Sequence, residues 1–369
     1  MRHAPERFVQ MGNADWFDHH AFEQANVLPE PTFQLELRVQ REKAKGVGGA
    51  PVFEFMEPVV LELKLTNVSG RPQVVPSRLL SPSHHLTVIV QRKGRPAREV
   101  VPFATYCWEP EYKALAPNES VYESLFASVG QGGWDIAEPG YYNVQVALHQ
   151  ETEDTVSNPL SIRVTPPQDY TEEYLAQDFF SDDVGRILTF DGSRVLEAGN
   201  ESLEEVAKQL PDRKVAVHVR MAQANAMMRE YKELSITGGG GGPMTPPADA
   251  KGEITTKQPD LDAAQELLGD VLDKPAEAAE SLGNIDLNYY LTRLSGALQE
   301  AGEKQEAAVV LDTLADGLAA RKAAAWVVDE VKGLRAALGL AAGDGAIPRA
   351  RKKKPAKIAR SGAAGGRSG

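Results

Sequence analysis

Hydrophobic and polar residues alternate with a period of two over much of the region from residue 32 to residue 164. The same alternation recurs in residues 59–66 and 142–148, and turn-forming residues separate such segments at intervals of about 8 to 15 residues, as in two-sheet β proteins. The first segment places four apolar residues on one side of an extended chain: Phe33, Leu35, Leu37 and Val39. The pattern predicts seven or eight short strands that form an antiparallel β-sandwich.

The segment from Glu138 to Tyr142 has the sequence Glu-Pro-Gly-Tyr-Tyr at the start of a predicted strand. A tyrosine at this place can donate a hydrogen bond from its hydroxyl to the backbone of the preceding connection, and Gly140 supplies the bend. The motif resembles the E to F corner of immunoglobulin and fibronectin type III domains. This resemblance implies an immunoglobulin-like β-sandwich over residues 32–166, with Tyr142 in a structural role.

Three further segments are similar to a bacterial intracellular proteinase inhibitor domain: Leu61–Asn67, Leu115–Ser120 and Pro139–Tyr142. Asn118 stands where that family usually has glycine. Such motifs consist largely of residues that are common in turns, so the resemblance supports the fold more than it supports inhibition.

Residues 167–234 have a mixed, mainly helical pattern. A capped helix is expected from Thr171 to Phe180, and a second is expected to begin at Ser202. Residues 186–192 favour a short strand and a turn, and residues 215–234 favour a helix, although residues 215–219 also fit a strand.

Residues 235–260 contain five consecutive glycines and several prolines, which predict a flexible linker. The helical segment expected beyond it, residues 261–340, resembles one tetratricopeptide repeat in its apolar spacing. Gly302 is expected to end the first helix of the pair, and the small Ala307 is expected to let the second helix lie close. The two ends of the chain are expected to be a lead-in segment, residues 1–31, and a disordered basic tail, residues 341–369.

Composition and charge narrow the classes of partner. The net charge is −12, yet residues 345–369 carry only basic charges, so the body is acidic and the tail basic. Nucleic acid or anionic lipid is therefore expected only as a nonspecific contact of the tail. No apolar stretch is long enough for a membrane-spanning helix, and the opening residues lack the apolar core of a secretory signal, which leaves the location open. The single cysteine, Cys107, excludes an intrachain disulfide.

The sequence motifs give no sign of catalysis. No nucleophile elbow or phosphate-binding loop occurs, and the histidine pairs lack the spacing of metal ligands, so no catalytic residue, cofactor or metal is expected. Aromatic residues in predicted loops are the candidates for a peptide or carbohydrate platform, with internal packing as the alternative: Tyr106, Trp108, Tyr112 and Trp134.

We therefore expect a non-enzymatic binding or scaffold protein that presents a β-sandwich and a helical module to protein partners. Two alternatives stay open. The chain could be the accessory C-terminal region of a larger hydrolase, or the sandwich could inhibit a proteinase.

Overall fold

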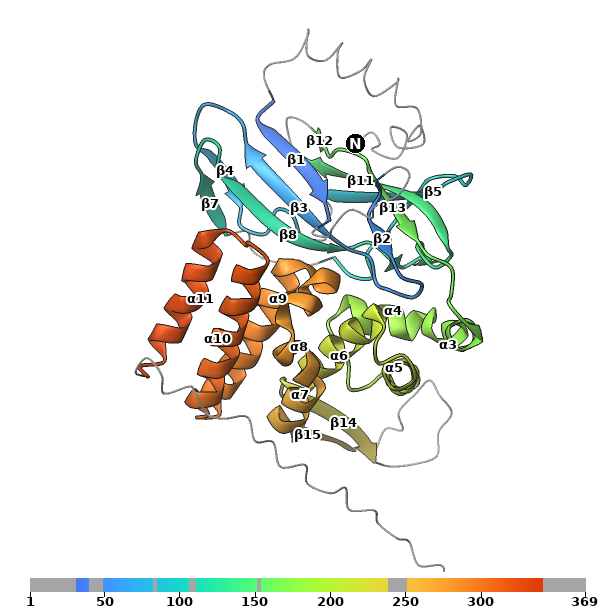
Figure 1. Ribbon diagram of the computed structural model, residues 1–369, viewed down its shortest axis with the longest axis vertical. Helices are drawn as coiled ribbons and strands as arrows, with labels where there is room; N and C mark the ends of the chain where they lie inside the picture. The colour runs from blue at the N-terminus through green and yellow to red at the C-terminus, as the bar shows by residue number, and fades with distance from the viewer. Residues whose placement is uncertain are drawn as a thin grey trace, which may run out of the picture.

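The computed structural model describes residues 31–39, 49–81, 85–105, 111–150, 154–237 and 251–340. It combines strands and helices, with a β-rich part that packs against a helical part (Figure 1). The expected lead-in segment and basic tail lie outside the described residues, apart from Pro31. Within the described residues, no helix combines the length and the apolar character that crossing a membrane requires.

Two sheets make up most of the β-rich part. The smaller has the order β1 (Phe33–Arg38), β3 (Val60–Asn67), β8 (Ser120–Phe126). The larger has the order β2 (Val52–Phe53), β13 (Leu160–Val164), β11 (Gly140–His149), β5 (Leu86–Arg92), β6 (Arg98–Glu99). Strand β12 (Asp154–Val156) also pairs with β11. All these pairings are antiparallel except that of β2 with β13.

Two short ribbons complete this part. One pairs β4 (Gln73–Pro76) with β7 (Tyr112–Leu115), and the other pairs β9 (Val129–Gly130) with β10 (Gly133–Trp134).

One hydrophobic core joins the two sheets. Leu35 and Leu37 of β1 belong to the same buried cluster as Val144 and Val146 of β11. Glu36, between these two leucines, points away from this core, because neighbouring side chains of a strand lie on opposite faces. The predicted alternation along β1 is confirmed.

The hydrogen bond predicted from Tyr142 to the preceding connection is also confirmed. The buried Tyr142 donates a hydrogen bond of 2.6 Å from its hydroxyl to the carbonyl oxygen of Glu138. The side chain of Arg92 donates to the next carbonyl, that of Pro139, at 3.0 Å. Gly140 has φ of +146°, a backbone conformation that residues other than glycine rarely adopt.

Four helices follow: α3 (Tyr170–Phe179), α4 (Asp182–Thr189), α5 (Glu197–Gln209) and α6 (Lys214–Met227). The strand expected at residues 186–192 is wrong, because α4 runs through Thr189. Ser181 caps this helix and Asp182 and Asp183 occupy its first turn, so its start is favourable. The helix expected from Val215 forms, but it ends at Met227.

The expected linker has paired strands at both ends. Strand β14 (Tyr231–Thr237) pairs with β15 (Lys251–Lys257), while residues 238–250 lie outside the described residues. The helices on either side of this hairpin share one core, in which Met221 of α6 lies with Leu268 and Leu291. The composition of the glycine-rich stretch had suggested a division of the helical part. The shared core shows that the helices on both sides of it pack together.

The C-terminal helices are α7 (Leu261–Leu267), α8 (Gly269–Asp273), α9 (Pro275–Glu300), α10 (Lys304–Ala320) and α11 (Ala325–Ala337). Helix α9 is interrupted at Gly283, where φ is +81°. Gly302, with φ of +88°, follows the end of α9 as predicted. The hydroxyl of Ser295 donates to the carbonyl of the fully buried Ala307 at 3.1 Å, so α9 and α10 lie close together. The likeness to a tetratricopeptide repeat stays a prediction.

Candidate binding cleft

A cleft of about 500 Å³ lies where the β-rich and helical parts meet. Strand β8 contributes Glu123 and Ser124, the turn after α4 contributes Asp191, and α9 contributes Asp286 and Tyr290. Three carboxyl groups from three separate elements thus line one cavity.

Asp191 is held by a tight turn. It has φ of +56°, and the next residue, Gly192, has φ of +105°. A Cβ atom on Gly192 would lie 2.1 Å from the carbonyl oxygen of Ala222, so only glycine fits against α6 here. The side-chain amide of Asn225, one turn further along α6, donates to the carbonyl of Asp191 at 2.7 Å and also holds the turn.

Tyr290 connects this turn to α9. Its hydroxyl donates a short hydrogen bond to the carboxylate of Asp191, and its ring is buried. Burial, followed by the charges of Asp191 and Asp286, raises the pKa of Tyr290 well above its ordinary value. Tyr290 therefore acts as a hydrogen-bond donor across the whole neutral range.

Asp286 lies in the turn of α9 that follows the break at Gly283. Burial raises its pKa to about 7, and the charges of Asp191 and Glu123 act in the same direction. The interaction with Ser124 lowers this pKa. Near neutral pH the carboxyl group of Asp286 therefore exchanges readily between its neutral and charged forms.

The other two carboxyl groups are shifted in the same direction. Burial raises the pKa of Glu123 although Arg78 and Lys113 oppose it, and burial raises the pKa of Asp191 although it accepts the bond from Tyr290. All three groups thus carry an energetic penalty when they are charged together.

Aromatic rings form part of the cleft wall. Phe190 and Tyr289 are 37% and 44% exposed, so both rings are open to solvent. Phe103 packs on Phe190 at 6.4 Å between ring centroids, and Arg293 donates to the hydroxyl of Tyr289 at 2.7 Å. The cleft therefore offers carboxyl groups together with apolar ring faces.

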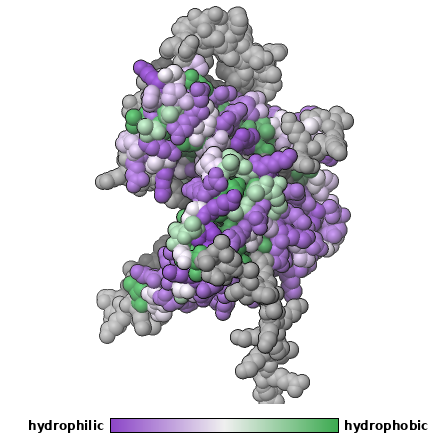
Figure 2. Space-filling view, turned by 60° about the vertical axis from the view of Figure 1, so that its left-hand side comes forward, coloured by the Kyte–Doolittle hydropathy of each residue, from purple (hydrophilic) through white to green (hydrophobic). Residues whose placement is uncertain are grey.

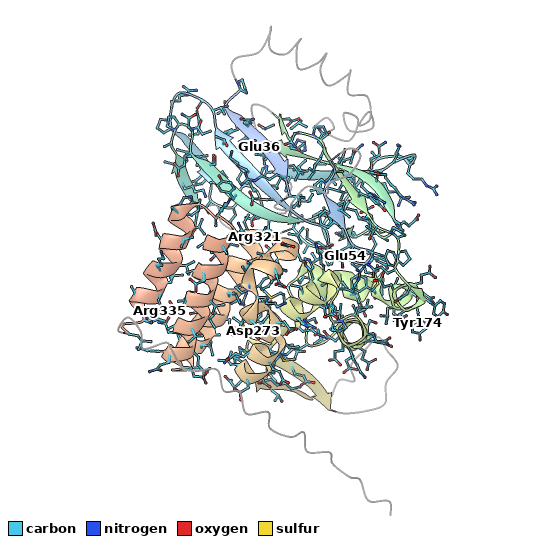
Figure 3. The ribbon with its side chains drawn as sticks, viewed as in Figure 1. Glu36, Glu54, Tyr174, Asp273, Arg321 and Arg335 are labelled. Carbon is cyan, nitrogen blue, oxygen red and sulfur yellow. The ribbon has the colours of Figure 1, made fainter. Side chains whose placement is uncertain are left out.

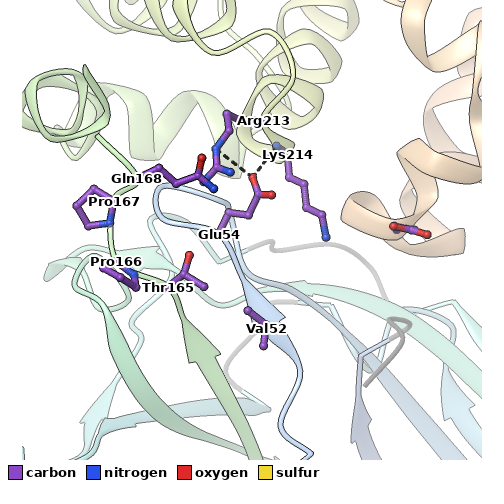
Figure 4. Close-up of a pocket in the computed structure, with 9 residues that line it drawn as sticks. Val52, Glu54, Thr165, Pro166, Pro167, Gln168, Arg213 and Lys214 are labelled. Atoms are coloured by element: carbon purple, nitrogen blue, oxygen red, sulfur yellow. Dashed lines mark hydrogen bonds and ion pairs between the residues drawn. The ribbon is translucent and has the colours of Figure 1, made fainter. Parts of the chain in front are cut away.

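A second recess, of about 600 Å³, lies at the other end of the junction (Figure 4). Glu54 accepts a hydrogen bond of 3.0 Å from the backbone of Lys214 and lies 3.4 Å from Arg213. Arg213 also lies 2.7 Å from the carboxylate of the buried Glu172. Because Arg213 pairs with carboxylates of both parts, Glu54 beside β2 and Glu172 of α3, we interpret the recess as a joint between the two parts.

Of the residues that the sequence suggested for binding, Tyr112 and Trp134 do not line the cleft. Tyr112 is 64% exposed on β7. Trp134 is used for packing, since its ring contacts Phe179 and Phe180 and its indole nitrogen donates to the carbonyl of Ser181 at 3.0 Å.

Tyr106 and Trp108 lie outside the described residues. The cleft residues Glu123, Asp191 and Asp286 are ordinary surface acids in the sequence, and only the pair Asp191-Gly192 gave a local signal, that of a turn. Among the described residues, no group of three or more His, Cys, Asp or Glu side chains is placed to hold a metal ion.

Comparisons with known proteins identify no family. No protein-family model matches the sequence, and no curated protein matches it. An alkylpurine DNA glycosylase, AlkC, of Pseudomonas fluorescens is similar to 40% of this chain over 34% of its own, with 10% identity and a TM-score of 0.22. A β-glucosidase of Listeria innocua is similar to 36% of this chain over 16% of its own, with 18% identity and a TM-score of 0.19. The chain spans about a third or less of the length of these structures, and superpositions this partial leave the family open.

Proposed function

We propose that this protein is a non-enzymatic binding protein and that the cleft holds a positively charged group of its ligand, such as a lysine or arginine side chain of a partner protein. The observation that carries the proposal is the convergence of Glu123, Asp191 and Asp286 on one open cavity. A cation in the cleft would offset the mutual repulsion of these groups.

The same geometry predicts proton release on binding. A cation beside Asp286 favours the charged form of its carboxyl group, so the pKa of about 7 falls when the ligand enters. Binding is then weaker at acid pH, where the proton competes with the ligand. The open ring of Tyr289 adds a surface for the apolar part of such a side chain.

Titration calorimetry with short peptides tests the proposal. Peptides with one central arginine or lysine are compared with the same peptide carrying glutamine, at pH 6 and pH 8. We expect heat from the basic peptides alone, stronger binding at pH 8, and a loss of about tenfold in affinity, roughly 1.4 kcal/mol, in Asp286→Asn. Glu204→Gln, which removes an exposed carboxylate on α5, is the control that leaves binding unchanged. Equal binding of all three peptides would refute the proposal.

For the β-rich part we propose the immunoglobulin-like sandwich that the corner motif implies. The hydrogen bond from Tyr142 to Glu138 and the core shared by two mainly antiparallel sheets support it. In such a domain the corner holds a crossover in place and takes no part in binding.

Acid–base catalysis is a second candidate, favoured by Asp286. A carboxyl group with a pKa near neutrality suits proton transfer, and Tyr290 next to Asp191 is a donor in the same cavity. Mass spectrometry of each peptide after long incubation separates the two candidates, because a binding protein returns its ligand unchanged.

A further inference from the structure

A recess of about 310 Å³ lies beside the hairpin that joins β5 to β6, the strands at one edge of the larger sheet. Three arginines of this hairpin line the recess: Arg92, Arg95 and Arg98. Strand β10 and the segment that follows it supply its aromatic and acidic residues, which are Trp134, Asp135 and Glu138. The described residues that line this recess are all different from those that line the cleft.

The pairing of the strands turns two of the arginines toward the core side of the sheet. Arg98 is the cross-strand partner of Val90, and Arg92 is the partner of Tyr142. Cross-strand partners share a face of the sheet, and both Val90 and Tyr142 are buried in the core. The inner face of the sheet therefore ends in guanidinium groups, at a place where the core could have continued with apolar residues.

Arg92 has a structural role in the recess. Its guanidinium group forms an ion pair with the carboxylate of Glu138, and it also donates a hydrogen bond of 3.0 Å to the carbonyl of Pro139. Arg92 therefore holds the segment before β11 in place, and its charge and that of Glu138 offset each other.

The other two arginines have no such partner. Neither Arg95 nor Arg98 forms a side-chain hydrogen bond or an ion pair within the part of the chain that the structure describes. Asp135 feels the charge of Arg98, which lowers the pKa that burial raises to about 6. The recess thus contains two unpaired guanidinium groups and one unpaired carboxyl group.

Charged side chains are common on this protein, so an exposed charge alone marks no site. Hydrophilic residues cover much of the face that Figure 2 presents. Two arginines of the helical part, both labelled in Figure 3, already have partners: Arg335 lies 3.2 Å from Asp312, and Arg321 donates to Asn284 at 3.1 Å. The recess differs because two guanidinium groups without partners share one concave wall.

This arrangement suits an anion with two or more oxygen atoms. A guanidinium group donates in a planar fork that matches the oxygens of a carboxylate or a phosphate. Two positive charges, those of Arg95 and Arg98, stand against the single charge of Asp135, so an anion balances the recess. Its volume lies at the small end of the range for ligand sites, which fits a small molecule.

We propose that this recess binds a small organic anion, whose carboxylate or phosphate group is held by Arg95 and Arg98. Pro96 and Ala137 also line the recess and offer an apolar surface to the carbon atoms of the ligand. Asp135 is a like charge in the same recess and weakens the binding. The site is independent of the cation-binding cleft.

Isothermal titration calorimetry of the full chain at pH 8 tests the proposal. The probes are inorganic phosphate, glycerol phosphate and succinate, with glycerol as the neutral control. We expect saturable binding with a Kd of about 1 mM or tighter for one class of anion, and none for glycerol. Binding of the two phosphates alone identifies a phosphate ligand, and binding of succinate alone identifies a carboxylate ligand.

Variants separate the recess from other basic residues, including those of residues 345–369. Arg95→Gln and Arg98→Gln should each weaken binding by at least about tenfold, and both should keep the native circular dichroism spectrum. Lys93→Gln is the matched control, because it removes the same charge from the same hairpin. Lys93 does not line the recess, and its ammonium group lies 5.9 Å from the centre of the exposed ring of Tyr141.

A gain of affinity gives an independent check. Asp135→Asn removes the like charge and should strengthen binding about threefold, a change that damage to the fold would not produce. Absence of saturation with all three anions would overturn the proposal. So would an affinity that Arg98→Gln and Lys93→Gln reduce equally, because the anion would then be held by the general charge of the surface.

Discussion

The hydroxyl of Tyr290 donates a hydrogen bond to the carboxylate of Asp191, which lies 99 positions earlier in the chain. This bond ties α9 to the turn after α4 on the wall of the cleft. Tyr290→Phe removes the donor and leaves a half-buried carboxyl group without this partner, so we expect a loss of about 1 to 3 kcal/mol in the free energy of unfolding. Urea denaturation at pH 7 measures it. Tyr289→Phe is the control, since that hydroxyl is exposed, and equal losses would contradict the assignment.

The stability of the protein should fall as the pH rises from about 4 to about 7. The pKa of Asp286 is raised to about 7 from an ordinary value of 3.8, so the folded protein holds a proton that the unfolded chain releases in this range. The stabilisation is complete below the unfolded pKa and is lost as the pH passes the folded pKa. The loss cannot exceed about 4 kcal/mol, and contact with solvent in the cleft reduces it.

Denaturation of Asp286→Asn at several pH values checks this dependence. Between pH 6 and 7 the free energy of unfolding of the variant should change less with pH than that of the wild type. At pH 8 the variant should be the more stable of the two. Part of the slope at lower pH should remain, because burial also raises the pKa of Asp135 to about 6. Asp135→Asn should remove only the part of the pH dependence that lies at lower pH. An unchanged slope in Asp286→Asn would show that this carboxyl group ionises normally.

Loss of the corner hydrogen bond should destabilise the β-rich part. Tyr142→Phe keeps the buried ring but leaves the carbonyl of Glu138 without its 2.6 Å donor, which should cost about 1 kcal/mol. Thermal unfolding followed by circular dichroism measures the change. Tyr141→Phe, one position earlier and 45% exposed, should have almost no effect.

Two glycine substitutions should act in opposite directions. Gly192→Ala forces a Cβ atom to within 2.1 Å of the carbonyl of Ala222 at a φ of +105°, so we expect a loss of several kcal/mol or failure to fold. Gly296→Ala adds a Cβ atom to the interior of α9 with nothing within 4 Å, and it should stabilise by about 0.5 to 1 kcal/mol. Chemical denaturation of both variants tests whether the turn at Gly192 is as tight as described.

The sequence predicted best the features that depend on near neighbours. The strand at residues 33–38 and the corner at Tyr142 depend on alternation and on a five-residue motif, so both could be recognised. The strand expected at residues 186–192 was wrong because Ser181 and the acidic first turn, just upstream, begin a helix that continues to Thr189.

The hairpin at residues 231–257 could not be predicted for a different reason. Strand β15 is mainly polar, and its regular structure depends on the hydrogen bonds that β14 supplies across the intervening residues. The glycine composition of residues 238–242 gave no information about these flanking partners.

The sequence by itself determined the strands and helices with a clear apolar period, because side chains two positions apart in a strand, or three and four apart in a helix, share a face. Only the tertiary structure decided the cleft. Glu123, Asp191 and Asp286 are unremarkable acids along the chain, and they acquire shifted pKa values because three distant elements bring them into one partly buried cavity. Desolvation and charge repulsion depend on that convergence and leave no local pattern in the sequence.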